Sequence, residues 1–366
     1  MIQTALEDAA AALGGWEQYV KSGDKVLLKP NLIAPRRPEE AATTHPEVLR
    51  ALIRILQARG CQVFVGDSAG GAIGGTAPTA KALMVAGFAQ VCDEEGAVLL
   101  NFDREGAVPV SSRTKHVGAA FHIARPIVEA DVVINVPKLK THSSAAYTGA
   151  VKNTFGCIPG LRKAAYHRDA PDLHVFGEVL ADIHLACKVQ LNILDGIVGM
   201  EGAGPTNGKP RPVGLLLVSD DALALDTVAA QVIGLDPQQL EVLQAAARLG
   251  VGEGDPARIT LLGDMSTIPH VPFLIPTSYK TIRRAPHWLL PALIDFLRTQ
   301  PQIDGAICKQ CGICRGSCPV DAIDTQFKID YHKCIDCLCC QELCPHGAVR
   351  LVRKNRLARR LIPVKH

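Results

Sequence analysis

Runs of apolar residues of strand length alternate with helix-like segments along most of the chain, and this alternation constrains the fold more than any other feature. Strand-like runs occupy residues 25–29, 62–67, 97–103 and 131–136, and apolar residues at helical spacing fill 45–60 and 79–88. Such βαβ alternation predicts a mostly parallel sheet with helices on its faces. The pattern resumes between residues 175 and 264, where it includes a strand-like run at 258–264, and predicts a second α/β unit.

A local signal marks the start of the first long helix. Thr44 and Glu47 have the spacing of a capping box, and Pro46 stands where a first helical turn tolerates proline. We therefore expect a defined helix start, with His45 at its positive end.

Length and composition limit the classes of protein to which the chain can belong. Its 366 residues suggest two or three domains. A hydrophobic share of 48%, a charged share of 20% and a net charge of only +3 are typical of a soluble globular protein. Aromatic residues make up 4%, too few for the base-stacking surfaces of nucleic-acid-binding proteins. No apolar run reaches the roughly 18 residues that a transmembrane helix needs. The N-terminal segment has no basic leader before an apolar run, as a secretory signal would have. We therefore expect a cytoplasmic protein.

One stretch carries bases without acids. From Val132 to Arg168 there is no Asp or Glu, and the stretch contains Lys138, Lys140, Lys152, Arg162, Lys163 and Arg168 together with His142 and His167. It follows a run typical of a buried strand, and its glycines between 149 and 160 allow the backbone to approach a ligand. Ammonium groups and the amide of Asn153 are donors for an anion. We therefore predict a site for a phosphate, a carboxylate or a negatively charged cofactor; the alternative is a long loop of surface lysines.

Nine of the 13 cysteines lie between Cys308 and Cys344, in two copies of the pattern C-x2-C-x2-C-x3-C-P. This is the bacterial two-cluster ferredoxin pattern, in which three cysteines of one run and the fourth of the other hold each cluster. We predict two [4Fe-4S] clusters, one held by Cys308, Cys311, Cys314 and Cys344 and the other by Cys334, Cys337, Cys340 and Cys318. Cys339 has no place in this spacing, and we interpret it as a small packed residue beside a cluster, with a substitute ligand as the alternative.

Other interpretations of the cysteines are weaker. Zinc also uses CxxC pairs, but it needs two pairs for each metal ion and not two runs of this form. Two clusters in series favour electron transfer. The alternative is that the clusters have a purely structural role.

The expected organisation is an α/β body at 1–267, which could divide near 160–190, and a ferredoxin-like α+β unit at 304–350. A proline-rich linker at 268–303 separates the two, and a basic tail follows at 351–366. The linker and tail are also the places where a partner protein or the surface of a membrane could be contacted.

Several short motifs together resemble a known family. They are KPN at 29–31, HPE at 45–47, GDS at 66–68, NVPKLKTH at 135–142, GAVKNTFG at 149–156, LDGIVGMEGAGPTNG at 194–208 and ALDTVAAQVIG at 224–234. This combination resembles the prokaryotic family called domain of unknown function 362, whose members often carry a C-terminal double-cluster ferredoxin. The resemblance implies an architecture more than a reaction. Family members usually open with a short strand, whereas this chain begins with a helix-like segment.

A more distant resemblance concerns His142, Lys152 and His167. Their spacing is similar to the cofactor region of the nickel-pincer lactate racemases, in which a lysine carries the pincer nucleotide. The resemblance implies Lys152 as the attachment point, with His142 and His167 near nickel. The racemases lack ferredoxin clusters, which a simple racemisation does not need.

The leading hypothesis is an iron-sulfur oxidoreductase whose clusters relay electrons to or from an anionic substrate or cofactor. Lys29, Asn31, Lys138, Lys140, Asn153 and His167 are the predicted anion-binding residues, Lys152 and His142 are the predicted catalytic residues, and His142 is the candidate proton donor. A redox partner protein is expected. The alternatives are a non-enzymatic electron carrier or maturation factor that docks a partner, and a nickel-pincer enzyme.

Overall fold

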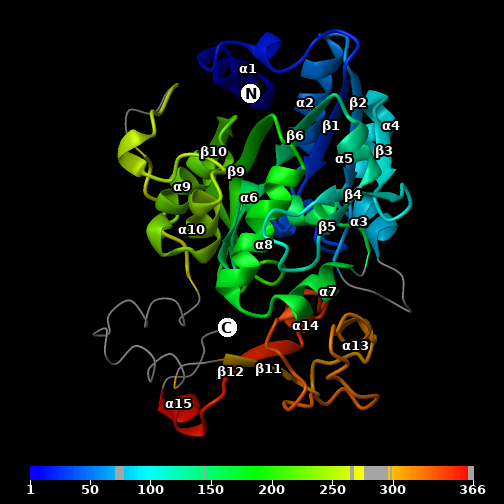
Figure 1. Ribbon diagram of the computed structural model, residues 1–366, viewed down its shortest axis with the longest axis vertical. Coiled ribbons are helices and arrows are strands. Elements are labelled where there is room, and N and C mark those ends of the chain that lie inside the picture. The colour runs from blue at the N-terminus through cyan, green and yellow to red at the C-terminus, as the bar shows by residue number, and fades with distance from the viewer. Residues whose placement is uncertain are drawn as a thin grey trace.

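A computed structural model describes residues 1–70, 78–143, 145–160, 162–263, 268–275, 296 and 299–361 (Figure 1). Its body is built on one eight-stranded sheet in the order β3-β2-β1-β6-β9-β7-β8, with β10 paired to β9. The strands are β1 (Lys25–Pro30), β2 (Gln62–Asp67), β3 (Val98–Asn101), β6 (Val132–Val136), β7 (Lys138–His142), β8 (Ala146–Thr148), β9 (Leu191–Glu201) and β10 (Lys209–Ser219). Within this sheet, as far as the chain is described, the β7–β8 and β9–β10 pairs are antiparallel and the other pairs are parallel. The predicted α/β class with a mostly parallel sheet is confirmed.

The strands of the two expected α/β units share this sheet. Strand β9 pairs with β6 in the register Ile134↔Leu191, so the later α/β stretch extends the first sheet instead of building another. The strand-like run near its end forms no strand among the described residues 258–263. Leu262 there is exposed, unlike the buried apolar side chains of the central strands.

Helices cover both faces of the sheet. Val26 and Leu28 of β1 belong to one hydrophobic core and Leu27 to the other, because successive side chains of a strand point to opposite faces. The Val26 core includes α1 (Ile2–Ala12), α2 (Pro46–Gln57), α3 (Thr79–Val85) and α4 (Phe88–Glu95). The Leu27 core includes α5 (Arg125–Glu129), α6 (Ala150–Asn153), α7 (Arg162–Asp169), α8 (Leu173–Ala186), α9 (Ala222–Val232) and α10 (Glu241–Arg248).

Shorter elements connect these layers. The 3-10 helices are η1 (Trp16–Gln18), η2 (Pro38–Glu40), η3 (Thr154–Cys157), η4 (Pro237–Gln239) and η5 (Pro256–Arg258). A separate antiparallel hairpin is formed by β4 (Ala107–Ser111) and β5 (Ala120–Ala124).

The start of α2 differs from the sequence prediction. The N-cap is His45, whose Nδ1 accepts a hydrogen bond from the Glu47 backbone at 3.3 Å. The Thr44 hydroxyl instead donates to the Val136 carbonyl and accepts from the Asn31 backbone. The predicted Thr44–Glu47 capping box was therefore wrong, because Thr44 is used to join β1 to β6.

Strand β9 sets the position of the basic stretch. Strands β6 and β7 both pair with β9 in parallel, one after the other, so β7 continues the line of β6 beyond Pro137. Residues 138–142 consequently lie beyond the carboxyl end of β6, close to the carboxyl ends of β1 and β2. In open α/β sheets this is the edge where ligands bind.

The C-terminal part forms a small unit below the body in Figure 1. Strand β11 (Thr299–Ile303) pairs with β12 (Val349–Arg353), and the short helices are α13 (Ile313–Gly316), α14 (Cys339–Glu342) and α15 (Arg356–Leu361). Residues 299–303, which the sequence interpretation placed in the linker, thus belong to a sheet of this unit, and part of the basic tail forms β12 and α15. Of the linker, residues 268–275 pack on the body through Phe273 and Ile275, and 276–295 and 297–298 lie outside the described residues.

Within the described part of the chain, no helix has both the length and the apolar composition that crossing a bilayer requires.

Candidate functional site

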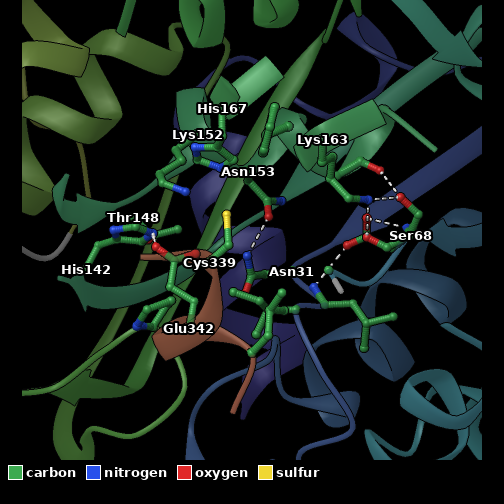
Figure 2. Close-up of a pocket in the computed structure, with 18 of the residues that line it drawn as sticks. Asn31, Ser68, His142, Thr148, Lys152, Asn153, Lys163, His167, Cys339 and Glu342 are labelled. Carbon is green, nitrogen blue, oxygen red and sulfur yellow. Dashed lines mark hydrogen bonds and ion pairs between the residues drawn. The ribbon is translucent and has the colours of Figure 1, made fainter. Parts of the chain in front are cut away.

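A cavity of about 110 Å³, here called the central cavity, lies between the body and the C-terminal unit (Figure 2). The body contributes residues from the carboxyl ends of β1 and β2, from β7 and β8, and from α6 and α7. The C-terminal unit contributes Ser317, Cys339, Glu342 and Leu343, most of them from α14 and the residue after it. Figure 1 shows α14 next to α7, consistent with this shared lining.

Most of the predicted anion-binding and catalytic residues meet in the central cavity. Its lining includes Lys29, Asn31, Lys140, His142, Lys152, Asn153 and His167. Lys138 does not line it. Further lining residues that the sequence prediction did not include are Asp67, Ser68, Thr148, Lys163, Cys339 and Glu342.

Several lysines near the cavity are occupied by internal partners. The ammonium group of Lys29 lies 2.8 Å from Asp67, and that of Lys138 lies 2.7 Å from Asp195. Lys140 donates to the Asn31 side-chain oxygen and to the Ala42 carbonyl, each at 2.7 Å. Burial lowers the pKa of Lys140 well below its usual value, and the nearby Lys152 acts in the same direction. These lysines hold the walls together. Asp67 and Asp195 neutralise Lys29 and Lys138, whereas the ammonium group of Lys140 is hydrogen-bonded to uncharged oxygens.

Lys163 is tied down in a similar way. Its ammonium group donates to the backbone carbonyls of Ser68 and Ile158 and to the Ser68 hydroxyl. Burial lowers the pKa of Lys163 to about 8, while Asp103 and Asp67 oppose this shift. Lys163 therefore fixes the end of β2 to the segment that leads into α7.

Lys152 is different, because its ammonium group makes no hydrogen bond or ion pair with any residue in the described ranges. Burial lowers its pKa, and Glu342 and Cys339 act in the opposite direction. Figure 2 shows the side chain reaching into the cavity from α6. A half-buried cation without an internal partner is a suitable ligand for an anion.

The helix that carries Lys152 is anchored by Asp226 of α9. Its carboxylate accepts hydrogen bonds from the backbone of Ala150 at 2.6 Å and of Val151 at 3.0 Å, and from the Tyr147 hydroxyl at 3.0 Å. Burial nevertheless raises the pKa of Asp226 to about 6. Asp226 thus satisfies the first free amides of α6 and fixes the direction of this short helix.

A chain of side-chain amides connects the cavity to the sheet. Asn31 donates to Asn153, Asn153 donates to Asn135, and Asn135 donates to Asn192, each at 2.8 Å. All four side chains are buried. Because each amide is held by its neighbours, Asn31 and Asn153 present a fixed polar wall to the cavity.

His142 faces Glu342 across the boundary between the two parts of the chain. Its Nδ1 accepts a hydrogen bond from the Ala145 backbone at 3.1 Å, so the neutral ring carries its proton on Nε2. Nε2 lies 3.1 Å from the Glu342 carboxylate. Burial, with a contribution from Lys152 and Lys140, lowers the pKa of His142 well below its usual value. Burial raises the pKa of Glu342 to about 7, against the effect of Lys152 and Lys140.

The remaining wall combines aromatic and hydroxyl groups. The His167 ring stacks on Phe176 at 4.3 Å between ring centres and meets Phe155 edge-on at 5.5 Å. Burial lowers the pKa of His167 to about 3, and Lys152 contributes. Thr148 is buried, and its hydroxyl has no hydrogen-bond partner within the described residues. The central cavity therefore holds an unsatisfied hydroxyl in addition to the ammonium group of Lys152.

The cysteines of the repeat surround two smaller cavities. One is lined by Cys308, Cys311, Cys314 and Cys344, here called the first cysteine set, and the other by Cys318, Cys334, Cys337 and Cys340, the second cysteine set. These are the two groups that the ferredoxin pattern predicts. In the parts of the chain that are described, no three His, Cys, Asp or Glu side chains form a group that could hold a single metal ion.

The surroundings of the two sets suit [4Fe-4S] clusters. The backbone amides of Ala348 and Ala322 each donate to a cysteine sulfur at 3.2 Å, to Cys344 and Cys318 respectively. Equivalent residues of the two repeats thus make the same bond. Hydrogen bonds of this kind stabilise thiolate sulfur, and four cysteines around one cavity are the ligand set of such a cluster. The donor chemistry and the grouping therefore fit the predicted cofactors.

The C-terminal unit is held at the cavity by the loop that follows β9. Thr206 donates through its hydroxyl to the Glu342 carbonyl at 2.6 Å, and Asn207 donates to the Gln341 carbonyl at 3.4 Å. Arg36 donates to Asn207 and to the Cys344 carbonyl. These bonds reach the backbone of α14 and of Cys344, so they position the segment that carries cysteines of both sets.

The sequence prediction did not include several residues that line the central cavity, and the sequence marks some of them more clearly than others. Lys163 lies in the acid-free stretch, and Ser68 follows the strand that ends at Asp67, so both could have been included. Thr148 has no distinctive pattern. Glu342 and Cys339 lie among the cysteine ligands, and only the packing of the two parts of the chain shows that they face the body.

Comparison with known proteins adds a family and a relative. The family described as domain of unknown function (DUF362) matches residues 26–231. The thylakoid-associated protein sll1697 of Synechocystis sp. (strain ATCC 27184 / PCC 6803 / Kazusa) is 39% identical over 241 residues, which are 65% of this chain and 72% of the relative. The lactate racemase apoprotein from Thermoanaerobacterium thermosaccharolyticum is a distant structural neighbour. It shares 12% identity and a TM-score of 0.39, over 63% of this chain and 55% of the racemase.

Proposed function

Because the chain belongs to the DUF362 family, whose description assigns no reaction, we propose a function from the central cavity itself. We propose an iron-sulfur oxidoreductase that binds a small anion at Lys152 and changes its oxidation state with electrons carried by two [4Fe-4S] clusters. The observation that carries this proposal is the shared lining of the cavity. An unpaired ammonium group stands on the body side, and the cysteine-bearing helix α14 forms the opposite wall.

The residues of the cavity support distinct tasks in this proposal. Lys152 binds the negative group of the ligand, and the Thr148 hydroxyl offers a hydrogen bond. Asn31 and Asn153 fix the ligand's orientation through their rigid amide chain. His142, with its proton on Nε2, and Glu342 can hold or pass a proton at the side of the ligand. When bound, each cluster would take up or release one electron, so that two clusters match a two-electron change.

The experiment begins with protein purified without oxygen, followed by iron and sulfide counting and mass spectrometry of any small molecule that accompanies it. About eight irons per chain are expected from two clusters of four. Colourless protein with little iron contradicts the redox part of the proposal.

Replacement of Lys152 tests the anion site. In Lys152→Met, the affinity for the co-purifying anion should fall about 10- to 100-fold, because a charge-assisted hydrogen bond is lost. The visible absorption of the clusters should stay unchanged. Lys209→Met, at an exposed lysine of β10, is the control and should bind as the unaltered protein does. Equal affinity in all three proteins would show that the anion binds elsewhere.

A second candidate function has one observation in its favour. His142, Lys152 and His167, the residues that resemble the nickel-pincer region, line the same cavity. A nickel-pincer enzyme would carry its nucleotide on Lys152, so intact-mass measurement should show an adduct and metal analysis should show nickel. Iron alone and an unmodified Lys152 would eliminate this candidate.

The cytoplasmic location, the redox partner protein and contact with a membrane surface stay predictions. The Synechocystis relative is described as thylakoid-associated, which is compatible with such a contact. A non-enzymatic electron carrier is the outcome if iron is present and no small molecule binds in the central cavity.

A further inference from the structure

We infer that Cys339 connects the central cavity to the second cysteine set, so that an anion in the cavity is sensed at the cluster held by Cys318, Cys334, Cys337 and Cys340. This inference rests on the proposed function and deepens it, because it decides which of the two clusters faces the ligand. It also gives a role to the one cysteine of the repeat that has no place in the ligand spacing.

The first line of evidence is the lining of the three cavities. Cys339 lines both the central cavity and the cavity of the second cysteine set. Ser317, which directly precedes Cys318 of the second set, and Leu343, which directly precedes Cys344 of the first set, also line the central cavity, so these two neighbours do not distinguish the sets. Among the described residues, none that lines the cavity of the first cysteine set also lines the central cavity.

The second line of evidence is the position of Cys339 in the repeat. Cys339 directly precedes Cys340 and lies two residues after Cys337, and both of these cysteines belong to the second set. Figure 2 shows the Cys339 sulfur on the cavity side of α14, opposite Asn153. The residue therefore touches a predicted cluster ligand and the ligand-binding space at the same time.

The third line of evidence is that the central cavity is built to receive a ligand. The ammonium group of Lys152 has no partner within the described ranges, and the buried Thr148 hydroxyl is likewise unsatisfied there. A negative charge bound by these groups shares the cavity with Cys339. That charge disfavours the addition of an electron to a cluster nearby, and more so in a partly buried site than in bulk water.

The first cysteine set is open to solvent on one side. Cys311 is exposed, and so are the neighbouring Lys309 and Gln310. An external redox protein can therefore approach the first set at this side. The inference accordingly expects electrons to pass from such a partner through the first set to the second set and the ligand.

The test uses the complete protein with its clusters, purified without oxygen, and acetate as the probe anion. The reduction potential of each cluster is followed by electron paramagnetic resonance during a redox titration, with and without acetate. Cys311→Ser and Cys334→Ser assign the two signals, because each exchanges a sulfur ligand of one set for oxygen. Acetate binding itself is measured by calorimetry.

We expect acetate to shift the potential of the second-set cluster to more negative values and to leave the other cluster unchanged. Lys152→Met should abolish the shift. Cys339→Ala should lower the potential of the second-set cluster without acetate, because a polar thiol beside its ligand cysteines is replaced by a methyl group, and should reduce the response to acetate. Cys61→Ala is the matched control, since Cys61 and Cys339 are both 7% exposed and Cys61 lies in the body far from the repeat.

The outcomes separate this inference from the proposed function. If acetate binds through Lys152 but shifts the first-set cluster, or both clusters equally, the inference is overturned and the proposed function stands. Potentials that Cys339→Ala leaves unchanged would reduce Cys339 to a packing residue and would also overturn it. Absence of acetate binding overturns the inference alone, whereas absence of iron overturns both.

Discussion

At the scale of single residues, the partners of each lysine decide what the site can do. Lys29, Lys138 and Lys140 all belong to the basic stretch or its neighbouring strand, yet their ammonium groups are held by Asp67, Asp195 and Asn31. Lys152 is left to face the cavity. Charge counted along the sequence therefore overstates the charge that is available to a ligand.

His167 gives a prediction about pH. Its pKa in the folded protein is about 3, below the usual 6.5, because of burial and Lys152. The folded state therefore binds fewer protons than the unfolded state, and stability falls as the pH drops below 6.5. Between pH 6.5 and pH 5 this amounts to about 2 kcal/mol.

The variant His167→Phe should keep the packing against Phe155 and Phe176 and remove this sensitivity. Between pH 7 and pH 5, the free energy of unfolding of the unaltered protein should fall by about 2 kcal/mol more than that of the variant. Urea denaturation without oxygen measures both. His332→Phe, at an exposed histidine, is the control. Identical pH dependence in the two histidine variants would contradict the assignment.

At the scale of elements, short helices bring the site residues to the edge of the sheet. Helix α6 is only four residues long, and it is fixed because Asp226 binds its first amides. The next element, η3, packs directly over the Lys29–Asp67 pair. The polar groups of these elements are satisfied by partners from distant strands, which allows such short helices to be stable.

Gly156 in η3 provides a test of this packing. A Cβ atom at this position would lie 2.3 Å from the Asp67 carboxylate and 2.7 Å from the Lys29 ammonium nitrogen. Gly156→Ala should therefore displace the ion pair and reduce the free energy of unfolding by about 1–3 kcal/mol. Gly305→Ala, where a Cβ meets no atom within 4 Å, should be nearly neutral. Equal stability of both variants, measured by urea denaturation, would show that η3 can move away at little cost.

At the scale of the whole molecule, the site exists because two parts of the chain meet. The body supplies Lys152 and His142, and the C-terminal unit supplies Cys339 and Glu342. The loop at 204–207 fixes the second part to the first through backbone carbonyls of α14. A displacement of α14 would therefore move part of the cavity wall.

Thr206→Val tests this connection. The change removes the donor to the Glu342 carbonyl and leaves that buried carbonyl without it, a cost of about 1–2 kcal/mol. Amide hydrogen exchange in residues 341–343 should accelerate about 5- to 30-fold. Thr260→Val, at an exposed threonine, should leave this exchange unchanged. Unaltered exchange in Thr206→Val would mean that other contacts hold α14.

Removal of iron tests the dependence of the C-terminal unit on its predicted clusters. Three of the six buried residues in its hydrophobic core are the cysteines 314, 340 and 344, so little core is left without a metal group. After chelation, limited proteolysis should cleave residues 304–361 rapidly and leave the body, with its two large cores, intact. A C-terminal unit that stays resistant without iron would show that the clusters are not needed for folding.

The sequence by itself determined the α/β class, the acid-free stretch and the grouping of eight cysteines into two sets, because these depend on local periodicity and on fixed spacing. It could not show that the two α/β stretches share one sheet, since strand pairing is a long-range contact. Only the tertiary structure decided which lysine is unpaired and that Cys339 and Glu342 face the body. The physical reason is that the partner of a buried charge is chosen by packing, and packing joins residues as distant in sequence as His142 and Glu342.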